Sequence, residues 1–146
     1  MNPVSFFSGR GRIVFLLFAA LFVTGLAVAG AQSAMVLPSV TVRDQTVNSS
    51  VVVQRVVSGG PGWIVIHADA NGSPGPVIGY TAVKEGVNTN VKVRIDAAKT
   101  TPVLYAMLHV DAGEIGKYEF PGADVPVKTN GKMVSPAFKA GSESMY

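Results

Sequence analysis

Short runs of β-branched and other apolar residues, separated by turn residues, recur along the chain after Gln32. The breaks between them include SGGPG, NGSPGP and KEGVN, and they follow one another at intervals of about 8 to 14 residues. This spacing is typical of β-sandwiches and barrels, and no segment has a convincing helical pattern. The sequence therefore predicts an all-β fold: a single antiparallel β-sandwich of about seven to eight strands, preceded by an N-terminal hydrophobic signal helix.

The expected strands cover residues 39–44, 51–57, 63–68, 77–82, 90–96 and 103–110, followed by a C-terminal hairpin of 125–129 with 133–138. Asn130 and Gly131 predict the turn of this hairpin, because both central residues of a type I′ turn need positive φ. Strands 63–68 and 103–110 are apolar on both faces, so we expect them at the centre of a sheet. As the third and sixth strands of a sandwich, they are expected to be neighbours.

The two central strands also raise the question of a partner. A two-layer sandwich buries one face of each sheet in its core, so something has to cover their outer apolar face. The candidates are a second copy of the chain, another protein and the C-terminal hairpin. An unpaired edge strand could also pair with a neighbouring chain. We therefore expect self-association or a protein partner, through the apolar strand faces or the edge strands.

The first 31 residues have the pattern of an export signal. Arg10 and Arg12 precede the apolar run 13–31, and Ala29 with Ala31 offers small residues for cleavage after Ala31. The alternative is a retained membrane anchor, because the run approaches the ~20 residues that span a bilayer. The predicted organisation is a signal peptide at 1–31, a linker at 32–38, the sandwich at 39–138 and a flexible tail at 139–146. Such a protein is secreted, periplasmic or on the cell surface.

Composition excludes several classes of site. The chain has no cysteine, so it has no disulfide framework, no thiolate metal ligand and no cysteine nucleophile. The net charge of +3 includes Arg10 and Arg12, and without them the Lys and Arg almost balance the 9 Asp and Glu. No basic run remains to follow a nucleic-acid backbone. We therefore expect no nucleic-acid partner, and membrane contact only through an uncleaved N-terminal segment.

Both histidines close an apolar run and are followed two positions later by an aspartate, as His67 with Asp69 and His109 with Asp111. In the structural interpretation, each histidine hydrogen-bonds the adjoining turn and each aspartate caps amides of the following loop. The alternative is a copper or zinc site in which Met107 adds a thioether on the face of His109 and the carboxylates give support. Because antiparallel neighbours end at opposite ends of a sheet, the two pairs are expected to lie apart.

Two further features carry weaker candidates. Asp69, Asn71 and Ser73 alternate as in calcium loops, but the glycine and glutamate that complete such loops are missing. Trp63 is expected in the core and, secondarily, as an aromatic platform for a sugar or a partner, with Tyr105 as the second binding candidate.

The segments VTVRDQTV, GWIVIHADANGSPGPVIGY, NVKVRIDA and LYAMLHVDAGEIGKYEFPGADVPV together resemble a family of exported bacterial and archaeal β-sandwich domains of unknown function. The resemblance covers residues 39–138. It implies a secreted or cell-surface location and an immunoglobulin-like or cupredoxin-like sandwich. It implies no activity.

No catalytic set accompanies the histidines. The serines at 49, 50, 58 and 73 lie in predicted turns, and the chain has no Gly-x-Ser-x-Gly elbow, so we expect no enzyme. The sequence therefore predicts an exported, non-enzymatic β-sandwich without a cofactor that acts as a cell-surface or envelope structural or interaction module. The alternative function is exported copper or zinc binding by His67 and His109 with Met107.

Overall fold

The structure, a computed structural model, describes Gly30 and residues 35–141. Residues 35–141 belong to one folding unit, Ala34–Tyr146. The predicted signal peptide, apart from Gly30, and residues 142–146 of the predicted tail lie outside the described residues. In the part of the chain that is described, no helix is long and apolar enough to cross a membrane.

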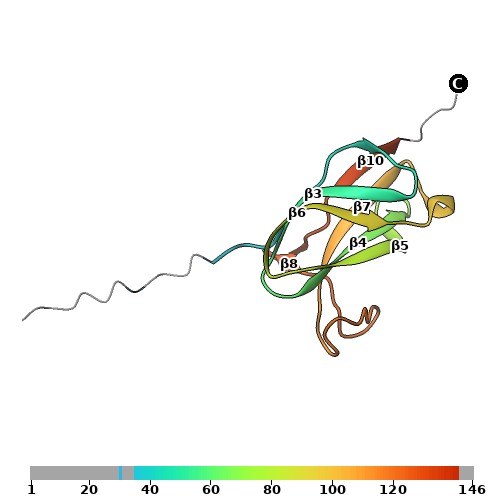
Figure 1. Cartoon of the computed structure of the whole chain (residues 1–146). Helices are drawn as coiled ribbons and strands as arrows, with labels where there is room; N and C mark the ends of the chain where they lie inside the picture. Colours follow the sequence, from blue (N-terminus) through green and yellow to red (C-terminus); the bar gives the residue numbers. More distant parts are fainter. Residues whose placement is uncertain (1–29, 31–34, 142–146) are drawn as a thin grey trace, which may run out of the picture. The chain divides into compact units, whose positions relative to one another are not determined.

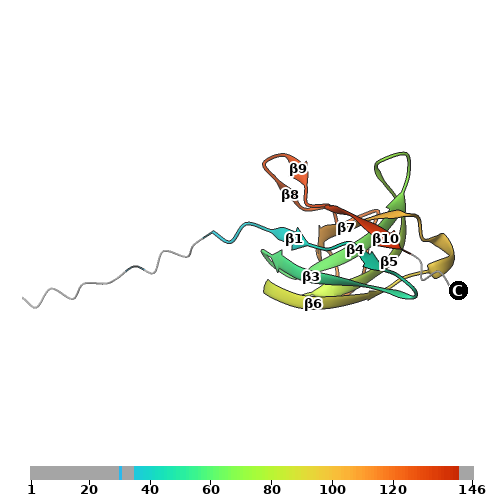
Figure 2. The same ribbon diagram turned by 90° about the horizontal axis from the view of Figure 1, so that it is seen from above.

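Two sheets form the domain, and Figures 1 and 2 show β3 and β6 in one layer with β4, β5 and β7 in the other. The three-stranded sheet has the order β1 (Ser39–Thr41), β3 (Ser50–Ser58), β6 (Gly86–Arg94). The five-stranded sheet has the order β2 (Gln45–Thr46), β10 (Ala137–Gly141), β7 (Val103–Val110), β4 (Gly62–Asp69), β5 (Pro74–Val83). A two-stranded sheet pairs β8 (Lys128–Thr129) with β9 (Lys132–Met133). The all-β prediction is confirmed: the described residues contain a single 3-10 turn, Ala97–Lys99, and no α-helix.

The core lies between the two main sheets. From the five-stranded sheet it receives alternate residues of the central strands, such as Ile64 and Ile66 on β4 and Leu104 and Leu108 on β7, all fully buried. The facing sheet contributes valines, among them Val53. At about 25 cal/mol per Å² of apolar surface removed from water, these branched side chains supply much of the stability of a chain without disulfides.

Strands β4 and β7 are antiparallel neighbours at the centre of their sheet, as predicted. One end of their outer face is covered by the chain's own loop 111–124, the orange segment below the strands in Figure 1. Tyr118 of this loop packs against Trp63, and Phe120 packs against His109. The apolar outer face that suggested a partner is therefore buried within the domain itself.

The N-terminal strand prediction was wrong in one respect. Residues 39–44 do not form one strand. Strand β1 ends at Thr41 and belongs to the three-stranded sheet. The chain then crosses to the five-stranded sheet, where β2 pairs with β10 in parallel. The sandwich is thus not wholly antiparallel. The side-chain amide of Gln45 explains the crossing, because it donates to Val52 O at 2.8 Å and accepts from Val52 N at 2.9 Å. It thereby ties β2 to a strand of the opposite sheet.

The predicted C-terminal hairpin is shorter than expected. Its turn is confirmed, since Asn130 and Gly131 have φ of 52° and 77°, and Figure 2 shows the hairpin projecting from the sandwich. The ladder, however, contains only two residue pairs. After β9 the chain returns to β7, where Leu108 N donates to Val134 O and β10 then pairs with the start of the strand. Because β10 extends to Gly141, residues 139–141 belong to the sheet and not to a tail.

Candidate functional site

The two histidines lie on the outer face of the central strands. The register pairs Trp63 with His109, Val65 with Met107 and His67 with Tyr105 across β4 and β7. Side chains of alternate residues share a face of a strand, so these six side chains form three rows on one surface. Val65 and Met107 form the middle row, between the two histidines. His67 is 4 % exposed, Met107 3 % and His109 0 %, so the rows are buried.

Each imidazole is fixed by its Nδ1 atom. His67 Nδ1 lies 2.8 Å from the carbonyl oxygen of Gly75, and His109 Nδ1 lies 2.8 Å from that of Asp124. A carbonyl oxygen only accepts, so Nδ1 must carry the proton in both rings. In a neutral imidazole the lone pair is then on Nε2. Neither Nε2 atom has a hydrogen-bond partner among the described residues, although both are buried.

The two Nδ1 atoms are held from opposite ends of the sheet. Gly75 follows the end of β4 and Asp124 lies beside the end of β7, and these ends lie at opposite ends of the sheet because the strands are antiparallel. Nδ1 and Nε2 point away from each other across an imidazole ring. Each Nδ1 thus binds a carbonyl at its own end of the sheet, and each Nε2, on the other side of its ring, is left without a partner in the described chain.

The rings accordingly approach each other, which corrects the expectation that the two pairs lie apart. The ring centroids are 5.9 Å apart and the ring planes differ by 16°. The strand ends do separate, but both side chains lean from their ends toward the middle row. The prediction considered the positions of the backbone and omitted the length and direction of the side chains.

The separation of the rings fits one shared metal ion. With a metal–nitrogen bond of about 2.0 Å, an imidazole centre lies about 3 Å from the ion, so two rings on opposite sides of it have centres about 6 Å apart. The rings are too far apart for face contact, since the stacked Tyr80 and Tyr118 rings have centroids 3.9 Å apart. In addition, a metal-bound histidine usually donates a hydrogen bond from its other ring nitrogen, as Nδ1 does in both rings here.

The aspartates serve the loops, as the structural interpretation predicted. Asp69 accepts from Gly72 N at 3.1 Å and from the Tyr105 hydroxyl at 2.8 Å. Asp111 accepts from Gly116 N at 2.8 Å through Oδ2, while its Oδ1 is buried without a partner in the described chain. Within the described residues no three His, Cys, Asp or Glu side chains are close enough to share an ion. No carboxylate of the described residues therefore joins the two imidazoles in such a group.

Burial keeps the histidines neutral. It lowers the pKa of both rings below the ordinary 6.5, against the opposing effect of their bonds to backbone carbonyls, and for His109 the neighbouring His67 adds to the decrease. A neutral ring keeps its Nε2 lone pair, which is the form that binds a metal. Burial also raises the pKa of Tyr118 to about 12. The hydrogen bond to Asp69 raises the pKa of Tyr105, so both phenols stay protonated at neutral pH.

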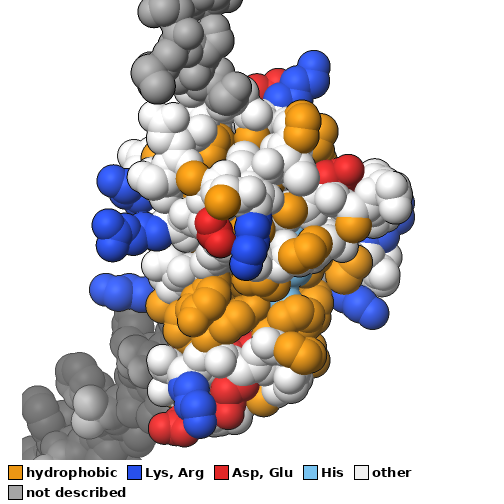
Figure 3. Space-filling view, turned by 90° about the vertical axis from the view of Figure 1, so that its right-hand side faces the viewer, with side chains coloured by type: hydrophobic (Ala, Val, Ile, Leu, Met, Phe, Trp, Pro, Cys, Tyr) orange, Lys and Arg blue, Asp and Glu red, His pale blue; other side chains and the backbone are white. Residues whose placement is uncertain are grey.

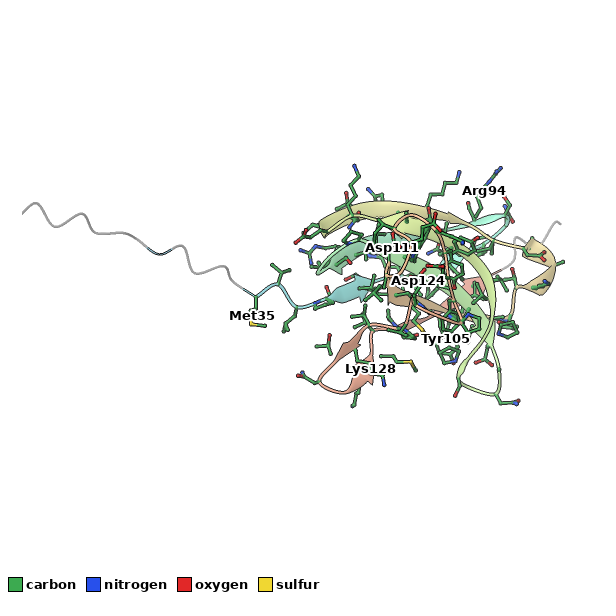
Figure 4. The ribbon with its side chains drawn as sticks, turned by 90° about the horizontal axis from the view of Figure 1, so that it is seen from below. Met35, Arg94, Tyr105, Asp111, Asp124 and Lys128 are labelled. Carbon is green, nitrogen blue, oxygen red and sulfur yellow. The ribbon has the colours of Figure 1, made fainter. Side chains whose placement is uncertain are left out.

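Loop 111–124 was not anticipated as part of the site. Its aromatic cover consists of Tyr118 and Phe120, with ring centroids 5.6 Å from Trp63 and 4.7 Å from His109 respectively. The fully buried Asp124 anchors the loop, since its carboxylate accepts from Ala112 N at 2.8 Å and from Glu119 N at 2.7 Å. Figure 4 shows Asp111 and Asp124 in this loop and Tyr105 on the strand. Two aromatic residues at alternate positions, Tyr118 and Phe120, were the sequence feature that could have indicated this aromatic cover.

The predicted aromatic platform and the calcium-like segment do not form open binding sites in the described structure. Trp63 and Tyr105 are buried, so neither presents an open ring surface. The calcium-like segment is a tight turn in which Ala70 N donates to Ser73 O at 2.8 Å and Asn71 has positive φ. Figure 3 shows hydrophobic side chains gathered on one side of the domain, with a small area of histidine visible between them. The histidine site thus lies just beneath an apolar surface.

Comparison with known proteins places the chain in a family. None of the curated proteins and none of the solved structures matches it. A family model does match, over residues 38–140, and its description is "Domain of unknown function (DUF7282)". The match spans both sheets and the two histidines and confirms the resemblance to a domain family of unknown function. The chain belongs to this family, DUF7282.

Proposed function

We propose that this domain binds one transition-metal ion between His67 and His109. The observation that carries the proposal is the pair of buried Nε2 atoms without a partner among the described residues, on two rings whose centroids are 5.9 Å apart. A buried polar atom without a partner costs about 1 to 3 kcal/mol, so a ligand shared by the two Nε2 atoms would stabilise the fold. The residues fit a metal, because both rings are neutral, held through Nδ1 and spaced for one ion.

The proposed role is binding, without catalysis. The site is closed, since the middle row and both histidines are buried and leave little room for a substrate beside the ion. Together with the export signal predicted from the sequence, this favours an exported, non-enzymatic protein that holds or carries a metal. A water molecule that donates to both Nε2 atoms is the competing occupant, and the experiment has to distinguish the two.

The proposal is tested by thermal unfolding of the purified, metal-stripped protein with and without stoichiometric copper or zinc. An ion that binds only the folded state stabilises it by about 2.7 kcal/mol at a free concentration of 100 Kd, and the melting temperature rises accordingly. The rise should be lost in His67→Ala and in His109→Ala. Tyr105→Phe is the matched control, because it removes a hydrogen bond on the same buried face without removing a ligand.

Either of two results would overturn the proposal. One is an unchanged melting temperature with both metals, which would leave the bridging water as the occupant. The other is a rise that survives in both histidine variants. If a variant does not fold, metal content after gel filtration of the wild-type protein decides the question, with one ion per chain expected and none contradicting the proposal.

Protein interaction is a second candidate function. Exposed hydrophobic side chains favour it, including Ile115 at 65 % and Val125 at 52 % exposed near the covering loop. We propose that this surface lets the domain associate with a second copy of itself. Analytical ultracentrifugation at high protein concentration should then detect dimers that Ile115→Ser weakens, and a monomer throughout would contradict this role.

A further inference from the structure

The ligands that surround the two histidines are soft and uncharged. Met107 lies between the rings in the register, paired with Val65, and is 3 % exposed. No carboxylate is close enough to form a group of three with both histidines in the described chain. The only additional donor in the middle row is therefore the thioether sulfur of Met107. A thioether is a ligand for soft ions, above all Cu(I), and a poor one for Zn(II).

Charge favours a monovalent ion. The free-energy cost of removing an ion from water grows with the square of its charge. This cost is therefore about four times as large for a divalent ion as for a monovalent ion of similar size. Zinc sites offset this cost with thiolates or carboxylates, or with a bound water in an open position. Two neutral imidazoles and a neutral thioether offer no compensating charge, and the burial of His109 and Met107 limits access of water.

Coordination number points the same way. The site offers two imidazole nitrogens and one thioether sulfur, which makes three ligands at most. Zinc in structural sites takes four ligands in a tetrahedron, and Cu(II) favours square or tetragonal geometry. Cu(I), in contrast, accepts two or three ligands, which is the number that the two imidazoles and the thioether provide.

We infer that the site selects Cu(I), bound by His67 Nε2, His109 Nε2 and Met107 Sδ. The inference rests on the proposed function and specifies its ion, its oxidation state and its third ligand. The domain would then hold copper in the reduced state and disfavour its oxidation, because the buried site provides neither the charge nor the additional ligands that Cu(II) requires.

The test compares two ions and two methionines. Cu(I) affinity is measured without oxygen by competition with bicinchoninate, and Zn(II) affinity by competition with a chromophoric zinc chelator. Cu(I) should bind once per chain and at least about 100-fold more tightly than Zn(II). Met107→Leu, which preserves side-chain volume, should weaken Cu(I) binding by about tenfold or more and leave Zn(II) binding unchanged. Met133→Leu is the matched control, because Met133 is exposed and should not affect either ion.

X-ray absorption of the wild-type protein tests for the sulfur ligand even if a variant does not fold, and the two methionine variants then assign the sulfur. The Cu(I)-loaded wild-type protein should show copper–sulfur scattering, which Met107→Leu removes and Met133→Leu retains. Zn(II) binding as tight as Cu(I), or the absence of a sulfur ligand in the wild type, would overturn this inference while leaving metal binding at the histidines in place. If neither ion binds, the proposed function fails, and the inference fails with it.

Discussion

The strongest single prediction concerns Asp124, which connects the covering loop to His109. Its carboxylate is fully buried and accepts from two loop amides, and its own carbonyl oxygen holds the His109 ring. Hydrogen bonds to a charged group contribute about 1.5 to 3 kcal/mol each. After allowance for the cost of burying the charge, which the mutation removes, Asp124→Ala should lower the unfolding free energy by about 3 kcal/mol. Asp124→Asn should cost less, about 2 kcal/mol, because one acceptor oxygen remains.

The assay is urea unfolding followed by tryptophan fluorescence. Trp63 is the only tryptophan and contacts Tyr118 of the loop, so its emission reports directly on the cover. Asp124→Ala should shift the native emission to longer wavelength as water reaches the indole. The control is Asp44→Ala, since Asp44 is exposed and accepts from only one amide, that of Lys139. An Asp124→Ala protein as stable as the Asp44→Ala protein, with native emission unchanged, would refute the anchoring role.

Three other predictions concern stability, each measured as the urea midpoint. Because the folded pKa values of His67 and His109 lie below 6.5, the unfolded chain takes up protons first as pH falls. The metal-free protein should lose stability as pH falls through 6.5 and reach a plateau below the folded pKa values, whereas a flat profile from about pH 7.5 to 5 would contradict the neutral pair. Gly79→Ala should cost at least about 2 kcal/mol, since its Cβ would overlap the carbonyl oxygen of Arg94, and a midpoint equal to wild type would show that β5 can move. Gly131→Ala should cost about 1 kcal/mol through its φ of 77° alone, because a Cβ there meets no neighbour, and a larger loss would indicate an additional contact.

Local patterns in the sequence predicted the central part of the fold. The apolar residues on both faces of 63–68 and 103–110 predicted adjacent central strands, and β4 and β7 are paired as expected. Asn130 and Gly131 predicted their turn because its positive φ angles are a property of two residues. The crossing of the chain from β1 in one sheet to β2 in the other could not be read from the same pattern, since it depends on hydrogen bonds between the Gln45 side chain and Val52 on the opposite sheet.

The sequence identified the residues of the candidate site, but it did not predict that the two histidine rings approach each other. The His-x-Asp pattern identified both histidines and the loop-capping role of Asp69 and Asp111. Their convergence depends on Gly75 and Asp124, whose carbonyl oxygens orient the rings from opposite ends of the sheet. Asp124 is 15 positions from His109, and only the folded loop brings it there. No spacing rule in the sequence contains that information.

The most direct test of the central claim is nitrogen-15 NMR of the two imidazoles in the metal-stripped wild-type protein, before and after one equivalent of Cu(I). Before addition, both rings should be neutral, with the proton on Nδ1 and an unprotonated Nε2. After addition, both Nε2 resonances should shift together and saturate at one ion per chain, while the Nδ1–H bonds to Gly75 and Asp124 persist. Two Nε2 resonances that stay unchanged, or only one that shifts, would contradict a metal ion shared by His67 and His109.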